Sequence, residues 1–539
     1  MEALRADVWV IGSGAAGLMA AIKARLEGAD VAVVGKSGPG KGTSSTIAVG
    51  AFSGPWHGLS EEAYKERVLT AGRGLNEREM VDIAAAEAPA RFQDLIDWGL
   101  TTKSAPGVFM ALPKDDPGER IPVWGREIVR CLLAKAEEVG VHFVNNLVVR
   151  SISAGEGGVC LRAYGARRRQ WLELRGGAAI LAAGGAGALF LHHDNPKRMG
   201  GDSHTLAYEA GCVMQDLEFV QFYPVAIAEP GKPVFLIEPE GADLGHLVNA
   251  AGEDILDKYD ITVRPAATHA RDALSQALFQ EIEQHDGAVY IDLTHVAKET
   301  WCANPISATK WAYLDAKFDA WNQPLRVAPV AHFSGGGART DTHGATSVPG
   351  LYAAGEAAGG MHGANRMGGN ALTECLVFGQ RAGKAAATFA ESRDQGVKAA
   401  APVVQPETGK PQTDADTLRA DLGRIMWRYS GIRRDAEGLA TGLKKVRTIA
   451  AEAARTRGIN EPRKLEKYLE TQLAAAAAEL IIQAASLRQE SRGTHARTDY
   501  PASDDETWRG HLKVVRHADG PNWWFDALPE EKGGVQAVE

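Results

Sequence analysis

The sequence predicts an α/β protein in which a Rossmann-like dinucleotide-binding domain is interrupted by a smaller α+β unit and followed by a helical C-terminal domain. Three observations predict this class. A glycine-rich strand-turn-helix segment begins at Val8, glycine-rich turns return around residues 350–372, and long alanine-rich helical periodicity follows residue 413. Glycine turns become rare between residues 229 and 328, which indicates an insertion in the nucleotide-binding domain.

The first expected element is a strand, turn and helix. An apolar strand over residues 8–11 leads into Gly12-Ser-Gly14-Ala15-Ala16-Gly17, and a helix-period segment follows. In this motif the first glycine permits a tight turn, the second lets backbone N–H groups approach a pyrophosphate, and the third lets helix and strand pack closely. A second apolar run over residues 30–34 follows at βαβ distance. We therefore predict a dinucleotide site here rather than a purely structural glycine turn.

The end of the second strand departs from the usual pattern. Gly35 and Lys36 stand where an acidic residue usually holds a ribose hydroxyl, so the ribose must be held in another way. The loop over residues 36–52 is rich in glycine, serine and threonine, which is typical of a segment that lies against a ligand or is mobile.

Further along, residues 60–100 and 125–140 show helical periodicity, and short runs that begin at residues 141, 158 and 171 resemble strands. A buried strand over residues 178–183 ends in a second glycine turn, Gly184-Gly185-Ala-Gly187. Two phosphate-approach turns on one sheet suit a dinucleotide larger than the first motif alone requires.

These patterns divide the 539 residues into five segments. Trp301, Trp311 and Trp321, at ten-residue spacing, are core candidates of the inserted unit, and residues 392–412, rich in Pro, Gln, Lys and Thr, read as a surface linker. The segments are the nucleotide-binding domain in two parts (1–228 and 329–391), the inserted unit (229–328), the linker (392–412), and the helical C-terminal domain with its tail (413–539).

Composition excludes several classes of protein. The formal net charge of -9 argues against a nucleic-acid partner, and no apolar run approaches the ~20 residues of a transmembrane segment. The N-terminus shows no basic-then-apolar leader, so we expect a cytoplasmic protein. Its five cysteines are scattered without Cys-x-x-Cys spacing, and we expect buried thiols, with no iron–sulfur or zinc site and no bound metal.

Four segments together resemble the flavoprotein subunit family of fumarate reductase and succinate dehydrogenase, which includes L-aspartate oxidase. The likeness spans nearly the whole chain, in family order. It implies FAD as the cofactor, a Rossmann-like FAD-binding domain, and a capping domain at residues 229–328. The four segments are residues 12–17; residues 182–224, which include Asp216-Leu-Glu-Phe-Val-Gln-Phe-Tyr-Pro224; residues 362–372, His-Gly-Ala-Asn-Arg-Met-Gly-Gly-Asn-Ala-Leu; and residues 490–501, Glu-Ser-Arg-Gly-Thr-His-Ala-Arg-Thr-Asp-Tyr-Pro, with Asp504, Asp505 and Trp508.

The resemblance assigns roles to individual residues. Arg271 matches the cap arginine that exchanges a proton with the substrate carbon, and His332 and Arg366 match the pair that binds a substrate carboxylate and polarises a conjugated C=C bond. Each also has a purely structural alternative: a surface ion pair for Arg271, a satisfied core histidine for His332, and a packing role for Arg366. Glu356 resembles the residue that takes the adenosine ribose hydroxyls, which would compensate for Gly35.

The implied cofactor-binding set follows the motifs. It comprises Gly12, Gly14, Ala15, Ala16, Gly17, Lys36, Ser44, Ser45, Thr46, Ala183, Gly184, Gly185, Asp202, Glu356, Asn370, Ala371 and Leu372.

Two departures from the family pattern concern the cofactor and the substrate. The family's flavin-tethering histidine, in Ser-His-Thr, is replaced in Ser44-Ser45-Thr46, so FAD should be held non-covalently, which favours alkene reduction. Tyr223 replaces a histidine, and Ile237-Glu238-Pro-Glu-Gly241 aligns with Thr-Glu-x-x-Arg, so residues that hold a second carboxylate and relay protons in the family are missing. Tyr223 and Glu238 are the remaining catalytic candidates there. Fumarate itself is in question, because a second carboxylate against Ile237 would be poorly paired.

The predicted function is FAD-dependent oxidoreduction of the fumarate reductase and succinate dehydrogenase type, with hydride transfer between flavin and the C=C bond of a small unsaturated carboxylate or dicarboxylate. Two alternatives stay open: an L-aspartate oxidase-like amino-acid oxidation, and an electron-transferring flavoprotein subunit with a vestigial substrate site. An iron–sulfur protein subunit is one expected partner, since this chain has no cysteine cluster of its own. Such a partner would place the protein peripherally at the inner membrane, whereas a small electron carrier would leave it free in the cytoplasm.

Overall fold

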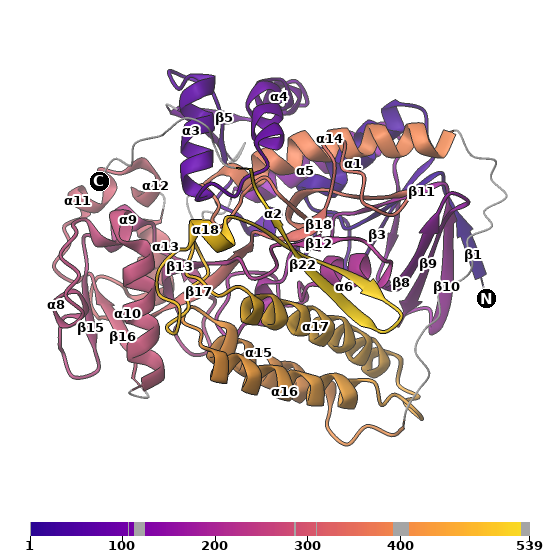
Figure 1. Ribbon diagram of the computed structural model, residues 1–539. Helices are drawn as coiled ribbons and strands as arrows, with labels where there is room; N and C mark the ends of the chain where they lie inside the picture. The colour runs from indigo at the N-terminus through magenta and orange to yellow at the C-terminus, as the bar shows by residue number, and fades with distance from the viewer. Residues whose placement is uncertain are drawn as a thin grey trace.

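The centre of the protein is a five-stranded parallel sheet. A computed structural model describes residues 2–105, 107–112, 124–284, 287–308, 310–391 and 409–529 (Figure 1). The strand order is β19-β11-β2-β3-β7, and every neighbouring pair is parallel. The predicted α/β class is confirmed. The strands are β2 (Val8–Ile11), β3 (Val31–Gly35), β7 (His142–Asn145), β11 (Ala178–Leu181) and β19 (Leu351–Ala353).

Helices α1 (Ala15–Leu26) and α14 (Asn370–Glu391) pack against one another beside this sheet, with α5 (Gly125–Glu138) next to α1. The predicted glycine motif explains the close packing. Gly12 has φ of 112°, and a Cβ atom there would lie 2.3 Å from the carbonyl oxygen of Ala182 on the neighbouring chain segment. A Cβ atom on Gly17 would lie 2.1 Å from the Gly12 carbonyl oxygen, so the helix could not start so near the strand.

Two smaller sheets flank the nucleotide-binding core. The strands expected near residues 141, 158 and 171 are present, the last two in a four-stranded sheet of order β1-β10-β9-β8. The helical periodicity of residues 60–100 corresponds to α3 and α4. These elements are β1 (Glu2–Arg5), β8 (Val148–Gly155), β9 (Gly158–Gly165), β10 (Gln170–Gly176), α3 (Glu61–Ala71), α4 (Arg78–Asp97), and the sheet of β4 (Ala51–Ser53), β6 (Val108–Ala111) and β5 (Thr102–Ala105).

The inserted unit is built on a second five-stranded sheet, of order β14-β13-β17-β16-β15, against which α10 (Arg271–Gln284) packs. Its core begins at Val225 and ends at Val327, so β13 and β17 carry the chain between the nucleotide-binding part and the cap. Their pairing is interrupted by two register shifts, one between Gln221 and Phe222 and one between Tyr223 and Ala226. The strands are β13 (Val220–Ile227), β14 (Phe235–Leu236), β15 (His246–Asn249), β16 (Val289–Asp292) and β17 (Leu325–Ser334).

The three tryptophans of this unit differ in burial. Trp301 is 1% exposed, as predicted for the core. Trp311 and Trp321 are half-buried, pack against this core, and stack on each other with ring centroids 3.6 Å apart. Ten-residue spacing does not return to one face across several short helices and turns, so periodicity alone could not place them.

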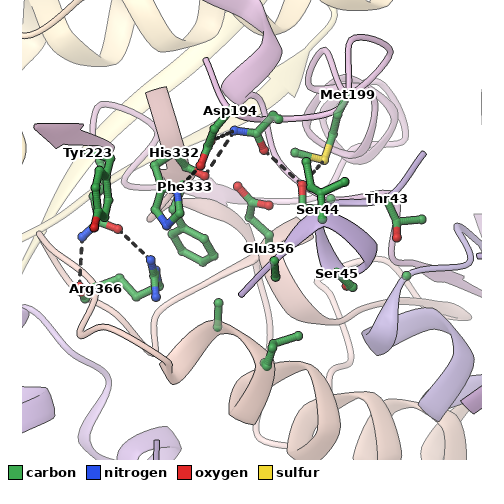
Figure 2. Close-up of a pocket in the computed structure, with 18 of the residues that line it drawn as sticks. Thr43, Ser44, Ser45, Asp194, Met199, Tyr223, His332, Phe333, Glu356 and Arg366 are labelled. Atoms are coloured by element: carbon green, nitrogen blue, oxygen red, sulfur yellow. Dashed lines mark hydrogen bonds and ion pairs between the residues drawn. The ribbon is translucent and has the colours of Figure 1, made fainter. Parts of the chain in front are cut away.

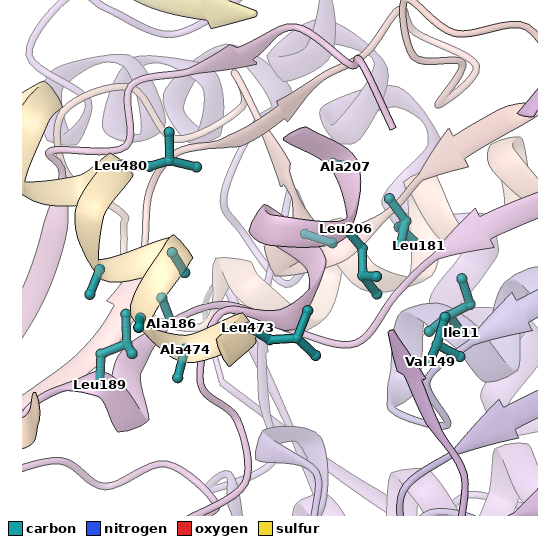
Figure 3. Packing of buried hydrophobic residues seen from close by; sticks show 14 of the residues in the cluster. Ile11, Val149, Leu181, Ala186, Leu189, Leu206, Ala207, Leu473, Ala474 and Leu480 are labelled. Carbon is teal, nitrogen blue, oxygen red and sulfur yellow. The ribbon is translucent and has the colours of Figure 1, made fainter. Parts of the chain in front are cut away.

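Three long helices form the predicted C-terminal bundle: α15 (Ala415–Ser430), α16 (Ala436–Ala453) and α17 (Pro462–Leu487). The alanine-rich face of α17 packs onto α6 (Asp202–Glu209), where Leu473 and Ala474 share a buried cluster with Leu206 (Figure 3). Most of the expected linker, residues 392–408, lies outside the described residues.

A β-hairpin follows the bundle and was not predicted. Its strands β21 (Gly510–His517) and β22 (Gly520–Ala527) pair with each other, and β21 pairs with β12 (Met214–Gln215) of the nucleotide-binding part. The domain predicted as helical therefore ends in a strand pair that returns to the core (Figure 1). An alternating run followed by Asp519-Gly520 is a hairpin signal that could have revealed it.

The remaining elements are short. Within the part of the chain described here, no helix is both long and apolar enough to span a bilayer. The short elements are α2 (Ser44–Ile47), η1 (Gly187–Leu189), α7 (Pro239–Ala242), α8 (Ile255–Lys258), α9 (Ala266–His269), α11 (Lys298–Cys302), α12 (Pro305–Ala308), α13 (Trp311–Phe318), β18 (Gly337–Arg339), η2 (Gly355–Ala357), β20 (Ala358–Gly359) and α18 (Asp505–Trp508).

Candidate active site

A cavity of about 910 Å³ lies between the carboxyl ends of the central sheet and the cap. All five predicted catalytic residues line it: Tyr223, Glu238, Arg271, His332 and Arg366. So do most of the residues predicted to bind the cofactor, namely Gly12, Gly14, Ala15, Ala16, Lys36, Ser44, Ser45, Ala183, Gly184, Asp202, Glu356, Ala371 and Leu372.

Four residues of the predicted cofactor set are not among the residues that line the cavity, and their direct role stays a prediction. Gly17 packs against Gly12, as described above. The Thr46 hydroxyl donates to the Gly40 carbonyl at 2.6 Å, and the Asn370 side-chain oxygen accepts from the Tyr64 hydroxyl. Gly185 lies against the Glu356 carboxylate. Each of these residues contacts a neighbouring residue. Membership of a motif does not by itself say which residues face the ligand.

The N-terminus of α1 fits a pyrophosphate. Gly14 caps the helix without a side-chain hydrogen bond, and the first turn holds no acidic residue. Its positive end therefore faces the cavity uncompensated, which is the arrangement that binds phosphate. Ser45 lies beside it, since its hydroxyl oxygen accepts from the Ala15 amide at 3.0 Å. The residues present fit a dinucleotide lying from this turn toward the cap.

At the end of β3, Lys36 forms an ion pair with Asp202 at 2.7 Å and another with Glu470 at 3.1 Å. These carboxylates thus lie beside the residue that follows Gly35. Asp202 also lines the cavity, as predicted, whereas Glu470 comes from α17 and was not anticipated. No local motif pointed to Glu470, because it lies more than 400 residues further along the chain.

Glu356 lines the same cavity as Gly35. Its carboxylate accepts from the Ser334 amide at 2.9 Å, and Figure 2 shows it near the middle of the site between Phe333 and Ser44. Burial raises the pKa of Glu356 to about 7, although hydrogen bonds from the Ser334 and Gly185 amides act in the opposite direction. Its contact with the adenosine ribose stays a prediction.

His332 is fixed by a carboxylate that sequence analysis missed. Its Nδ1 atom lies 2.6 Å from Asp194 Oδ2 (Figure 2). Asn195 donates to the carbonyl oxygens of Ala331 and His332, and its own side-chain oxygen accepts from Ser44 at 3.1 Å. The histidine is thus oriented and partly exposed to the cavity, unlike a core residue. The polar run His192-His-Asp-Asn195 after the second glycine turn was the available signal.

Arg366 is held by its terminal nitrogens. One donates to the Met367 carbonyl and the other to Gln221 Oε1, each at 3.0 Å, and the guanidinium lies 4.7 Å from the centroid of the Phe333 ring. Its Nε atom is buried and has no hydrogen-bond partner among the described residues. Burial lowers the pKa of Arg366 to about 10, which makes an added carboxylate a favourable partner. We call His332 and Arg366 the carboxylate clamp.

The cap contributes Arg271 to the lining of the cavity. Arg271, the first residue of α10, is exposed, and its Nε atom donates to the Ala267 carbonyl at 3.2 Å. The ring of Tyr223 lies 5.6 Å from that of His332, so Tyr223 connects the clamp with the cap. Burial raises the pKa of Tyr223, nearby Glu238 adds to this effect, and Arg271 opposes it.

Glu238 has a partner that the sequence did not reveal. Lys310, 2% exposed, donates to the Glu238 carboxylate and, at 3.1 Å, to the Leu236 carbonyl, and it also lines the cavity. Ile237 is buried in the cap core and is not among the residues that line the cavity. At Gly241 a Cβ atom would lie 2.8 Å from the Trp301 ring, so no side chain could be added there without displacing that ring.

Cysteines and metal-binding groups contribute little to this site. All five cysteines are free thiols, and Cys131, Cys160 and Cys212 are buried. Cys375 lines the cavity, and burial raises the pKa of its thiol. In the described ranges, no three His, Cys, Asp or Glu side chains are placed to hold a metal ion.

Comparisons with known proteins agree with this geometry. A family model described as "FAD binding domain" matches residues 7–372, and one described as "Fumarate reductase flavoprotein C-term" matches residues 419–527. The L-aspartate oxidase of Streptomyces coelicolor is 32% identical, with 96% of this chain and 92% of that protein covered. One subunit of the CoM/CoB fumarate reductase of Methanothermobacter marburgensis is 30% identical, with 96% and 98% covered.

Among solved structures, an E. coli quinol fumarate reductase chain superposes with a TM-score of 0.84 at 25% identity, covering 99% of this chain and 98% of that one. The match includes the cap and the C-terminal part as well as the nucleotide-binding domain. Two family models and full-length relatives thus agree with the predicted cofactor, FAD. The chain belongs to the family of FAD-dependent oxidoreductases that includes the flavoprotein subunits of fumarate reductase and succinate dehydrogenase.

Proposed function

We propose that this chain reduces the C=C bond of a small α,β-unsaturated carboxylate, with Arg271 as the proton donor. The observation that carries the proposal is that one cavity joins the carboxylate clamp to Arg271 on the cap. FAD, when bound and reduced, supplies the hydride. The residues predicted to hold it are those of the α1 N-terminus, Ser44 and Ser45, and Asp202 near the end of β3.

The clamp both binds and activates the substrate. Arg366 offers its unpartnered Nε and remaining N–H groups to the substrate carboxylate, while His332, held by Asp194, donates from the other ring nitrogen. Positive donors on that carboxylate draw electron density from a conjugated C=C bond and stabilise the charge that develops during hydride addition. A fixed clamp also sets which alkene carbon is presented to the donor.

Arg271 completes the reaction from the cap. A guanidinium is a weak acid, with an unperturbed pKa above ~12, so proton donation requires a closed site in which loss of the proton costs less. The exposed position of Arg271 at the start of α10 suits a group that is brought onto the substrate when the cap, residues 229–328, closes. Closure would also exclude water from the transferred hydride.

A single experiment tests the proposed reaction. The FAD-loaded protein is reduced anaerobically with dithionite, and the flavin absorbance is followed after addition of fumarate, acrylate-type acids or arylacrylates. We expect rapid reoxidation by at least one of these acids with formation of the saturated acid. Reoxidation by none of them would favour the third possibility, an electron-transferring subunit with a vestigial substrate site.

L-Aspartate oxidation is the second candidate, because a relative of that name is 32% identical over nearly the whole chain. The same clamp could hold the α-carboxylate of an amino acid. In this case L-aspartate should bleach the oxidised flavin anaerobically, and oxygen or fumarate should restore it. Failure of L-aspartate to bleach the flavin would remove this candidate.

We propose that FAD is bound non-covalently, because serine stands at position 45 and among the described residues that line the cavity His332 is the one imidazole. His332 is committed to Asp194 and the substrate carboxylate. Acid precipitation of the holoprotein should therefore release the yellow colour into the supernatant. Flavin retained in the pellet would contradict the proposal.

We also propose an iron–sulfur protein as electron donor, with peripheral placement at the membrane through it. The relative in Methanothermobacter marburgensis is named as one subunit of a fumarate reductase, and the match to the fumarate reductase C-terminal family model supports a shared docking region. Purification from the native cell decides this. Co-elution with an iron protein is expected, while an iron-free oligomer active with free reduced dyes would indicate a small carrier and a cytoplasmic protein.

A further inference from the structure

The cap side of the cavity differs in charge from the clamp. Its wall, which we call the cap wall, consists of Tyr223, Phe235, Leu236, Glu238 and Lys310. Lys310 is the cation of this wall, but its ammonium group already donates to Glu238 and to the Leu236 carbonyl, and it lies 5.0 Å from the centroid of the Phe235 ring. The pair is almost completely buried, so Glu238 neutralises Lys310 without help from solvent.

Arg73 and Arg271 are two further cations that line the cavity near the cap, and a carboxylate accompanies them. Asp272 is the next residue in α10 and also lines the cavity. The pKa of Asp272 is raised by burial, while Arg73 and Arg271 attract its charged form. Asp272 thus offsets one of these two arginines. In the cap wall itself, among the described residues, Lys310 and Glu238 form a neutral pair, with no further cation comparable to Arg366.

The pKa of Tyr223 indicates whether a negative charge is favourable on this side of the cavity. Burial disfavours its phenolate form, and Glu238, Glu240 and Asp194 add repulsion that exceeds the attraction of Arg271, so its pKa is raised. A substrate carboxylate at the same place would meet the same repulsion and would lose its hydration shell. One phenolic hydroxyl can donate only one hydrogen bond in return, which does not offset burial of a full charge.

We propose that the substrate places its single carboxylate in the clamp and turns an uncharged end toward the cap wall. The substrate class is then an α,β-unsaturated monocarboxylate whose far substituent is apolar or a neutral hydrogen-bonding group. This inference rests on the proposed function and narrows its substrate. The reaction itself is unchanged: hydride adds to one alkene carbon, the proton of Arg271 adds to the other, and the saturated acid leaves with the same far substituent.

The test uses two substrates of the same shape. Fumarate and its monoamide, fumaramate, share the C=C bond and one carboxylate, and they differ only in the charge of the far end. With reduced holoprotein we expect kcat/KM for fumaramate to exceed that for fumarate by at least about tenfold, the effect of ~1.4 kcal/mol. A preference for fumarate would overturn the inference and leave the proposed function intact. Turnover of neither, nor of any other unsaturated acid, would instead refute the proposed function.

An equilibrium measurement gives a readout that does not depend on turnover. Binding of the saturated analogues succinate and succinamate to the oxidised holoprotein is measured by calorimetry. Succinamate should bind at least about tenfold more tightly, because the same charge difference applies without any chemical step. Equal affinities, or tighter binding of succinate, would count against a neutral cap wall.

A variant tests whether the Glu238–Lys310 pair causes the preference for an uncharged substrate end. Glu238→Gln removes the carboxylate that neutralises Lys310, so the ratio of fumarate to fumaramate kcat/KM should rise about tenfold or more. Since both substrates undergo the same reaction, the ratio cancels any effect of Glu238 on the chemistry. Lys298→Met is the matched control: it changes the charge of the cap next to the Trp311 ring, outside the cavity lining, and should leave the ratio unchanged. An unchanged ratio in Glu238→Gln would overturn the assignment.

Discussion

The carboxylate clamp and the cap contribute to the same cavity in different ways. Arg366 is held by two hydrogen bonds and a neighbouring ring, and His332 is held by Asp194, all within the nucleotide-binding part. Arg271 is exposed and its guanidinium makes its hydrogen bond to a carbonyl four residues earlier in its own chain segment. The groups that bind are thus built in advance, whereas the group proposed to donate a proton belongs to a separate sheet and helix.

This difference separates recognition from chemistry. A prebuilt clamp binds the substrate in the ground state and in the transition state alike, and therefore contributes to KM as well as to turnover. A group delivered by the cap acts on the reacting carbon only when the cap is closed. Substitutions in the clamp should therefore change both KM and kcat, whereas substitution of Arg271 should change mainly kcat. Measuring both constants tests this difference between the two regions.

The largest effect is expected at Arg271. Arg271→Gln keeps the size and polarity but cannot donate a proton, so kcat should fall by about 10²–10⁴-fold while KM changes little. Stopped-flow reoxidation under saturating substrate measures this. Arg264→Gln, an exposed cap residue outside the cavity lining, is the control and should behave as wild type. Near-normal turnover in Arg271→Gln would mean that the proton comes from elsewhere, with Glu238 or Tyr223 the next candidates.

A smaller loss of a different kind is expected at Arg366. Arg366→Ala removes two charge-assisted hydrogen bonds to the substrate of ~1.5–2 kcal/mol each, so kcat/KM should fall by roughly 10²–10³-fold with a clear rise in KM. Arg366→Lys should recover only part of this, because an ammonium cannot form the planar fork. An Arg366→Ala protein with unchanged KM would show that the substrate carboxylate binds elsewhere.

Substitution of Asp194 tests whether its carboxylate orients His332 in the clamp. Asp194→Asn removes a charge-assisted hydrogen bond to His332, and kcat/KM should fall by about 10–100-fold, following ~1.5–3 kcal/mol for such a bond. FAD content and the melting temperature should stay close to those of wild type, since the change preserves shape. If FAD is lost instead, Asp194 serves the cofactor site rather than the substrate.

The smallest effect concerns stability. The pKa of Glu356 rises from its usual 4.5 to about 7 on folding, so the folded state binds more protons than the unfolded state between these values. The FAD-free protein should therefore lose stability as the pH rises from about 4.5 to 7, and it should lose less when Glu356→Gln removes the titrating group. Urea midpoints at several pH values measure this slope. Parallel slopes for wild type and variant would contradict the burial of a titrating Glu356.

Local signals predicted much of the nucleotide-binding fold. Backbone atoms come so close to positions 12 and 17 that a side chain would not fit there. The glycines in the sequence therefore predict this close packing. The alternating run of β21 was equally readable, but it lies far from the strand β12 that it joins, and it was missed. Motif order predicted that Arg271, His332 and Arg366 would share one site, and all three line the cavity.

Partners across long sequence separations could not be predicted. Lys310 pairs with Glu238 across 72 residues, and Glu470 meets Lys36 only after the C-terminal bundle packs on the core. An isolated lysine or glutamate carries no pattern that distinguishes a buried partner from a solvated one. The same limit applies to Glu356, whose motif was recognised but whose place beside Ser334 depends on how β17 packs.

The register shifts in the β13–β17 pair have a mechanical consequence. His332 stands at the first shift, Tyr223 lies between the two, and the strands enter the cap core at the second. An irregular position bends more easily than a regular ladder. A cap that turns at the second shift would carry Arg271 with it and leave His332 in place, whereas a turn at the first shift would move Tyr223 as well.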